Sequence, residues 1–368
     1  MATNKTLKIA IRDLRKCYSD GILAGLRNFD NYWARDSFFS SFGSLALKDY
    51  NVVKKNLELF LKYEKNGQLA LRIDNYYFYS LKFLGIKIKG KFKARYKEDK
   101  LHHIPKDQNS LFIINLNEYI KATKDYKFLR KNYYKVKKII DWNGKDLIKE
   151  ESYSGWADSI KRKGYVLYTN VLHCKALYDF YKLSKDKEYL RLHNKIKDKI
   201  NKKFWNGKYY VDFLGSNYLA TDGNILGILF NIFPKNRIKK VINSIEEKRT
   251  GFISLAYPQY KRSLVFFPFH FLNMYDYHNM IWLWLDSLYA LILYKNNFKK
   301  KSLELMNKIS DLIIKYDNVY EIYERNEDKK KKEYAPVSRF FYKSEVPFAW
   351  SAGIFIYTVK EMKLIKQL

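Results

Sequence analysis

Short clusters of aromatic and polar residues recur along the chain, roughly every sixty residues, which is typical of a repeated structural unit. They occupy residues 33–36, 107–109, 156–159, 221–224, 277–279 and 347–350. Each precedes or begins a stretch whose apolar spacing predicts a helix. Aromatic rings stack on the C–H face of a sugar, and carboxylates, amides and guanidinium groups bind its hydroxyls. If the six clusters meet at one end of the fold, they would line a sugar-binding pocket.

Asp158 is the strongest candidate for an acid in such a pocket. It lies in residues 153–159, which also contain Gly155 and Trp156. A carboxyl beside a tryptophan in a closed pocket loses hydration, so we expect a raised pKa for Asp158. It could then stay protonated near neutral pH and act as a general acid. The alternative interpretation is an aspartate that only caps a turn.

Hydrolysis of a glycosidic bond by this chemistry needs a second carboxyl to activate water. Glu321 stands between two aromatic residues in an apolar run, and we predict that it is this base. Glu345, two residues before Pro347, is the alternative base, whereas Glu324 is expected at the solvent side or the rim. For all three glutamates, the competing interpretation is a surface carboxylate without a catalytic role.

The remaining cluster residues are candidates for contacts with the substrate. Asp36 could instead be an ordinary helix cap worth about 1 kcal/mol, and a histidine such as His278 more often makes a structural hydrogen bond. Trp350 fits a pocket wall or the core equally well. The predicted substrate-binding residues are Trp33, Arg35, Asp36, Asp107, Trp156, Asn224, Tyr277, His278, Asn279 and Trp350.

No motif for a metal or an organic cofactor is present in the sequence. His102 and His103 have no Asp, Glu or His at a spacing that suits a metal. Neither a glycine-rich phosphate loop nor a dinucleotide-binding fingerprint occurs. We therefore expect chemistry that needs neither a metal nor a cofactor.

The net charge of +32 could attract nucleic acid or an anionic membrane. The lysines are scattered through every segment, however, and no nucleic-acid-binding motif appears. The most apolar stretch, residues 280–294, is short for a bilayer and contains Asp286. We expect a carbohydrate substrate as the partner, with no specific nucleic acid and no membrane.

The two cysteines, Cys17 and Cys174, form no disulfide framework, and no apolar run of signal-peptide type follows the first residues. This predicts a reducing, cytoplasmic compartment. Hydrophobic residues make up 47% of the 368, which is typical of a globular protein. Glycine (15) and proline (6) are scarce, and this scarcity favours helices.

Apolar spacing predicts an all-α fold whose helices lie near residues 5–20, 36–48, 50–63, 107–123, 126–141, 168–183, 186–203, 221–232, 234–244, 278–295, 297–315 and 347–364. Very short links join several pairs into antiparallel hairpins. Every second helix, beginning with 36–48, starts at a cluster and should belong to an inner ring. Short strands are expected within residues 66–104 and at 208–212. No linker divides residues 1–368, so we predict a single domain.

Four of these segments resemble motifs of the six-hairpin glycosidases, which include glucoamylases, trehalases, neutral invertases and the α-1,6-glucosidase part of glycogen-debranching enzymes. Residues 32–36 resemble the first-hairpin Arg-Asp motif, and residues 154–159 resemble the Trp-x-Asp acid motif. Residues 319–322, followed by 348–351, are similar to the debranching-type end. The resemblance implies an (α/α)6 barrel, inversion at the anomeric carbon, Asp158 as acid and Glu321 as base.

The expected activity is therefore that of an inverting, exo-acting glycoside hydrolase on α-glucosides, of the debranching or glucoamylase type. An invertase-like sucrose hydrolase is the nearest alternative. A sugar epimerase or isomerase on the same barrel would want a pair of histidines, and a non-catalytic sugar-binding protein would need no carboxyl pair. For inversion, the carboxyl groups of Asp158 and Glu321 should lie roughly 6.5–9.5 Å apart, because a water must fit between acid and base.

Overall fold

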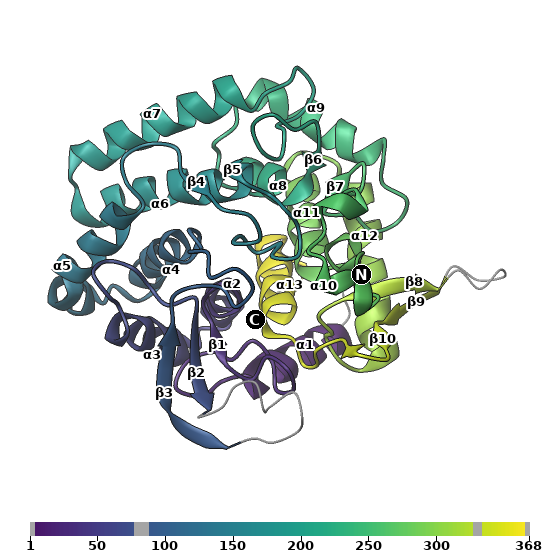
Figure 1. Cartoon of the computed structure of the whole chain (residues 1–368), viewed down its shortest axis with the longest axis horizontal. Coiled ribbons are helices and arrows are strands. Elements are labelled where there is room, and N and C mark those ends of the chain that lie inside the picture. Colours follow the sequence, from purple (N-terminus) through teal and green to yellow (C-terminus); the bar gives the residue numbers. More distant parts are fainter. Residues whose placement is uncertain (1–3, 77–87, 327–332, 365–368) are drawn as a thin grey trace.

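The computed structural model describes residues 4–76, 88–326 and 333–364 (Figure 1). Six helices form an inner ring in which each helix packs against the next one, and the last packs against the first. They are α2 (Ala34–Ala46), α4 (Gln108–Thr123), α6 (Leu167–Ser184), α8 (Thr221–Leu229), α11 (Leu283–Lys295) and α13 (Ala349–Glu361). These correspond to every second predicted helix, which confirms the predicted alternation.

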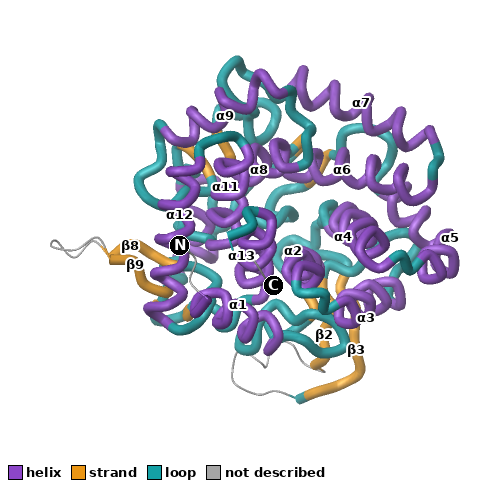
Figure 2. Tube along the Cα trace, turned by 180° about the vertical axis from the view of Figure 1, so that it is seen from behind, coloured by secondary structure: helices purple, strands orange, loops and turns teal. Residues whose placement is uncertain are grey.

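A second layer of helices surrounds this ring (Figures 1 and 2). It contains α1 (Asn4–Lys16), α3 (Tyr50–Lys62), α5 (Tyr126–Trp142), α7 (Lys187–Lys203), α9 (Lys235–Glu246) and α12 (Lys299–Tyr316). The outer helices bury one face only, whereas α11 buries every residue from Leu283 to Leu293. An apolar surface on all sides suits a helix covered on all sides. The architecture is the predicted (α/α)6 barrel.

Two glycines let α2 and α13 close the ring at very short range. A Cβ atom on Gly43 would overlap the backbone oxygen of Gly353, and one on Gly353 would lie 2.6 Å from the Cα atom of Ser40. The backbones of the two helices are therefore in direct contact. Nearby, the rings of Phe39 and Trp350 stack with their centroids 4.7 Å apart.

Short strands lie at the end of the barrel at which the inner helices begin. A three-stranded antiparallel sheet joins β1 (Tyr32–Trp33), β2 (Arg72–Tyr76) and β3 (Lys89–Arg95). This confirms strands in the predicted 66–104 insertion, of which residues 77–87 lie outside the described part of the chain. The other strands, paired in order, are β4 (Lys149–Glu150) with β5 (Gly164–Tyr165), β6 (Leu219–Ala220) with β7 (Ala256–Tyr257), β8 (Tyr323–Asn326) with β9 (Glu333–Pro336), and β10 (Ser338–Arg339) with β11 (Tyr342–Lys343).

The predicted strand at 208–212 is wrong, since the described chain forms only isolated bridges there. The side-chain amide of Asn224 replaces a strand partner: it accepts from the Tyr210 backbone N–H at 3.2 Å and donates to the Tyr210 carbonyl at 2.8 Å. No helix in the described part of the chain is long and apolar enough to cross a membrane.

The helix predicted from residue 278 begins later, at Leu283. Residues Tyr277–Asn279 form a 3-10 turn, η3, and the chain then runs extended. Ile281 exchanges two backbone hydrogen bonds of 3.0 Å with Tyr323. This bridge holds the segment that follows α12 against the segment that precedes α11. Two further short helices, η2 (Arg262–Leu264) and α10 (Pro268–Phe271), lie in the loop that precedes η3.

Candidate active site

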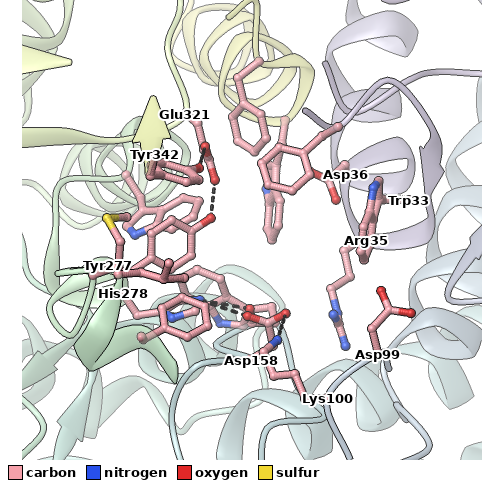
Figure 3. Close-up of a pocket in the computed structure, with 18 of the residues that line it drawn as sticks. Trp33, Arg35, Asp36, Asp99, Lys100, Asp158, Tyr277, His278, Glu321 and Tyr342 are labelled. Atoms are coloured by element: carbon pink, nitrogen blue, oxygen red, sulfur yellow. Dashed lines mark hydrogen bonds and ion pairs between the residues drawn. The ribbon is translucent and has the colours of Figure 1, made fainter. Parts of the chain in front are cut away.

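A pocket of about 410 Å³ opens at the end of the barrel where the inner helices begin (Figure 3). This volume falls in the range of about 300–1,000 Å³ that is typical of small-molecule sites. Four of the six sequence clusters line it. They contribute Trp33, Arg35, Asp36, Trp156, Asp158, Tyr277, His278, Phe348 and Trp350, and the wall also includes Glu321, Tyr342 and Lys100.

The other two clusters support the pocket from behind. Asp107 is fully buried and accepts a hydrogen bond of 2.5 Å from Nε of Arg35. Asp222, also fully buried, accepts one of 2.6 Å from the indole nitrogen of Trp156. All six clusters therefore lie at the same end of the barrel. Asp107 was predicted to contact the substrate, but it holds Arg35 instead and does not line the pocket.

Two predicted substrate contacts, Asn224 and Asn279, also lie outside the pocket wall. The side-chain amide nitrogen of Asn224 donates hydrogen bonds to the carbonyl of Tyr210 and, at 2.7 Å, to the carbonyl of Ala220. Asn279 is the third residue of the η3 turn. Because a 3-10 turn directs consecutive side chains about 120° apart, Tyr277 and His278 face the pocket and Asn279 does not.

Glu321 is buried among hydrogen-bond donors in the segment between α12 and β8. Its two carboxylate oxygens accept hydrogen bonds from the hydroxyls of Tyr277 and Tyr342, and one also accepts the backbone N–H of Glu345 at 3.2 Å. Burial raises the pKa of Glu321 to about 7, even though both tyrosine bonds favour the ionised form. A carboxyl with a pKa near 7 is well matched to proton transfer at neutral pH.

Asp158 faces Glu321 from the other side of the pocket (Figure 3). Its side chain is 31% exposed, and its Oδ2 lies 2.8 Å from Nζ of Lys100. Burial is the largest single effect and would raise the pKa of Asp158, but Lys100, with smaller contributions from His278 and Arg35, outweighs it, and the pKa lies below its ordinary value. The predicted rise in this pKa is therefore wrong, because no pattern along the chain indicated that Lys100 would lie beside Asp158.

His278 lies close to Asp158 without adding a second charge. Its Nε2 is 3.9 Å from Oδ1 of Asp158, and its other ring nitrogen is 2.6 Å from the hydroxyl of Ser159. Burial lowers the pKa of His278 to about 4, so the ring is neutral near pH 7. Among the groups that lower the pKa of Asp158, Lys100 is the cation in direct contact with it and has the largest effect.

Asp36 is a third carboxyl in the pocket wall. It sits in the first turn of α2 and is not the cap of that helix, since the residue at the cap position is Trp33. Burial, and then the nearby charge of Glu321, raises the pKa of Asp36 to about 8. The group is therefore largely protonated at neutral pH and can donate a hydrogen bond as well as accept one.

Glu345, the alternative base, has a structural position. Its carboxylate is fully buried outside the pocket wall and accepts four backbone N–H groups, from residues 26–29, at 2.8, 2.6, 2.6 and 3.2 Å. A carboxylate with four donors around it holds a loop and has no free face for water. Glu324 pairs with Arg339 at 2.9 Å and does not line the pocket.

Sequence reasoning missed Lys100 and Tyr342, which touch the two central carboxyls. Lys100 lies in a loop and Tyr342 in β11, both outside the six clusters, so the repeat contained no signal for them. Within the described residues, no group of three His, Cys, Asp or Glu side chains could hold a metal ion.

No protein-family profile and no curated protein sequence matches this chain. Solved structures do match its fold. A wild-type glycosidase aligns with a TM-score of 0.70 and 10% identity over 98% of both chains. A GH63 mannosylglycerate hydrolase from Thermus thermophilus, in complex with glucose, aligns with a TM-score of 0.68 and 11% identity over 96% of this chain and 99% of that one.

A rhamnosidase from Klebsiella oxytoca with rhamnose bound aligns with a TM-score of 0.69 and 12% identity, over 97% of this chain and 63% of the rhamnosidase. At such low identity, these likenesses establish the fold that the chain shares with them, an (α/α)6 barrel.

Proposed function

We propose that the protein is an inverting, exo-acting glycoside hydrolase that acts on α-glucosides. The observation that carries the proposal is the pair of carboxyls, Asp158 and Glu321, on opposite sides of one aromatic pocket (Figure 3). The names of the structural neighbours, two glycosidases and a rhamnosidase, support the same reaction class. Because fold alone does not fix chemistry, the argument rests on the site.

In the proposed reaction, Asp158 gives its proton to the glycosidic oxygen while the bond from that oxygen to the anomeric carbon breaks. A water molecule attacks the anomeric carbon from the opposite face, and Glu321 takes one of its protons. The products are the free alcohol and a sugar of inverted configuration. Glu321 then releases its proton to solvent, and Asp158 takes one up.

The rest of the pocket suits a single terminal sugar. Trp33, Trp156 and Trp350 offer aromatic faces for its C–H groups. Below the pocket, the fully buried ring of Trp284 lies 5.0 Å from Trp156 and 4.6 Å from Trp350, between ring centroids. These contacts fill the barrel beneath the site, so a glycan can enter from the open end only. This supports exo-acting cleavage.

The alternatives differ in what they require of the pocket. A sugar isomerase or epimerase would want a pair of histidines, and His278 is the one histidine among the described lining residues. An invertase-like enzyme would use the same carboxyl pair. Only the identity of the substrate that is cleaved therefore distinguishes it from an α-glucosidase.

The test is a measurement of sugar released from trehalose, sucrose, isomaltose, maltose and glycogen. We expect glucose from at least one of trehalose, isomaltose, maltose and glycogen, whereas cleavage of sucrose alone would indicate the invertase-like activity. Asp158→Asn and Glu321→Gln should each lower kcat by about a hundredfold or more with little change in KM. Glu324→Gln, which changes a carboxyl outside the pocket wall, is the control and should retain activity. No release of sugar by the wild-type enzyme from any α-glucoside, whether its leaving group is neutral or anionic, would contradict the proposal.

A further inference from the structure

Lys100 is the one lysine among the described residues that line the pocket, and it pairs with the proposed acid. Its Nζ lies 2.8 Å from Oδ2 of Asp158 and 5.8 Å from the ring centroid of Phe269. Figure 3 shows Lys100 beside Asp158, on the far side of the pocket from Glu321. The side chain is 18% exposed, so a bound molecule can reach it.

The loop that carries Lys100 is fixed by hydrogen bonds to one of its own side chains. The buried carboxylate of Glu98 accepts the backbone N–H groups of Lys100 at 2.5 Å, Leu101 at 2.7 Å and His103 at 2.9 Å. A carboxylate with three backbone donors fixes the turn around it. The position of Lys100 is therefore built into the fold of this loop.

The other cation of the pocket wall already has its own partners. Arg35 is paired with the buried Asp107 at 2.5 Å and also donates to the carbonyl of Ser154. Its charge is neutralised behind the pocket. The charged and titratable groups that face Asp158 are Lys100, His278, Arg35, Asp36 and Tyr277. Among them, Lys100 makes the direct contact.

This pairing conflicts with the role proposed for Asp158. A general acid must hold a proton, whereas a lysine in contact with it stabilises the ionised form. Asp158 can act as a general acid once Lys100 forms an ion pair with a different anion. Because Asp158 protonates the leaving oxygen, the space next to it on the side away from Glu321 receives the leaving group, and Lys100 lies there.

We propose that the natural substrate is a glycoside whose leaving group carries a carboxylate or a phosphate, and that this anion takes Lys100 away from Asp158. The inference rests on the proposed hydrolysis and adds the class of substrate. Binding of the anion removes the strongest of the attractions that keep Asp158 ionised and places a negative charge near it. Both effects raise the pKa of Asp158, which then takes a proton from solvent and passes it to the glycosidic oxygen. A neutral leaving group leaves the ion pair intact.

The kinetic test compares three α-glucosides that differ in the leaving group: glucosyl glycerate, glucosyl glycerol phosphate and the neutral glucosyl glycerol. We expect kcat/KM to be at least about tenfold higher for an anionic substrate than for the neutral one, equivalent to about one unit in the pKa of the acid. The better of the two anionic substrates identifies carboxylate or phosphate as the anion recognised.

The variant Lys100→Met should act in opposite directions on the two kinds of substrate. It should lower kcat/KM for the anionic glucosides and raise it for glucosyl glycerol, because Asp158 loses the cation that held it ionised. Lys97→Met removes an exposed charge from the same loop outside this pocket, and it should leave the preference unchanged. Equal rates on all three substrates, or an equal loss on all three in Lys100→Met, would overturn the inference.

A second readout does not depend on turnover. Calorimetric titration of glycerate into the intact protein at about pH 6, in buffers of different ionisation enthalpy, measures protons taken up on binding. We expect proton uptake by the wild type and none by Lys100→Met or Asp158→Asn. If no glucoside is cleaved but this uptake occurs, the proposed hydrolysis fails and the anion site stands. Binding without proton uptake refutes the proposed displacement of Lys100 from Asp158, and no binding refutes the anion site itself.

Discussion

The hydroxyl of Tyr342 offers a way to tell which of the two carboxyls is the base. This hydroxyl donates to one oxygen of Glu321 and thereby favours the ionised carboxylate. A hydrogen bond to a charged group contributes about 1.5–3 kcal/mol, and one pKa unit corresponds to about 1.4 kcal/mol. Tyr342→Phe should therefore raise the pKa of Glu321 from about 7 to about 8–9.

The direction of the resulting pH effect depends on the role of Glu321. A general base must be ionised, so its activity is present above its pKa and is lost as the pH falls through it. Raising that pKa moves the acidic limb of the kcat/KM profile to higher pH by about one to two units. At neutral pH, the variant should be slower by about tenfold or more.

The assay is kcat/KM for an α-glucoside measured from acidic to alkaline pH in the wild type, in Tyr342→Phe and in the control Tyr134→Phe. Tyr134 is 82% exposed on α5, so its variant should reproduce the wild-type profile. If the alkaline limb moves instead of the acidic one, Glu321 is the acid and the assigned roles are reversed. If neither limb moves, the titration of Glu321 does not control the reaction.

Three further predictions concern the frame of the site and its charge. Glu345→Gln should lower the free energy of unfolding by about 3 kcal/mol, because an amide N–H would then face backbone donors; denaturant unfolding measures this, with the surface variant Glu361→Gln as control. Gly43→Ala should cost about 1–3 kcal/mol, since its methyl would meet the backbone of Gly353; wild-type stability would contradict the close α2–α13 contact. Despite the net charge of +32, a titration at physiological salt should show no submicromolar affinity for DNA or RNA.

The architecture could be predicted from the sequence because two signals agreed. The stretch that forms α11 is apolar around its circumference, whereas an outer helix such as α7 is apolar on one side. The polar clusters recur at the start of the inner helices. The boundary at Leu283 could not be predicted, because a backbone bridge between Ile281 and Tyr323, which are distant in sequence, keeps the preceding residues extended.

The candidate site could be predicted only in part, because some of its residues are marked by their neighbours in the sequence and others come together only on folding. Asp158, Glu321 and Trp156 have polar and aromatic neighbours in the sequence that mark a pocket. The division between lining and supporting residues, such as Arg35 and Asp107, depends on how helices are rotated, and composition does not encode that rotation. The ionisation of Asp158 depends on Lys100, which arrives from a separate loop through a contact made only in the folded chain.

The most direct test of the central claim is the configuration of the sugar at the moment of release. Proton NMR of a fresh reaction with an α-glucoside that the enzyme cleaves distinguishes the two anomers of glucose before they interconvert. If Asp158 and Glu321 act across the pocket with a water between them, β-glucose appears first, and Glu321→Gln abolishes its formation. Initial release of α-glucose, or unchanged formation of β-glucose by Glu321→Gln, would contradict the account.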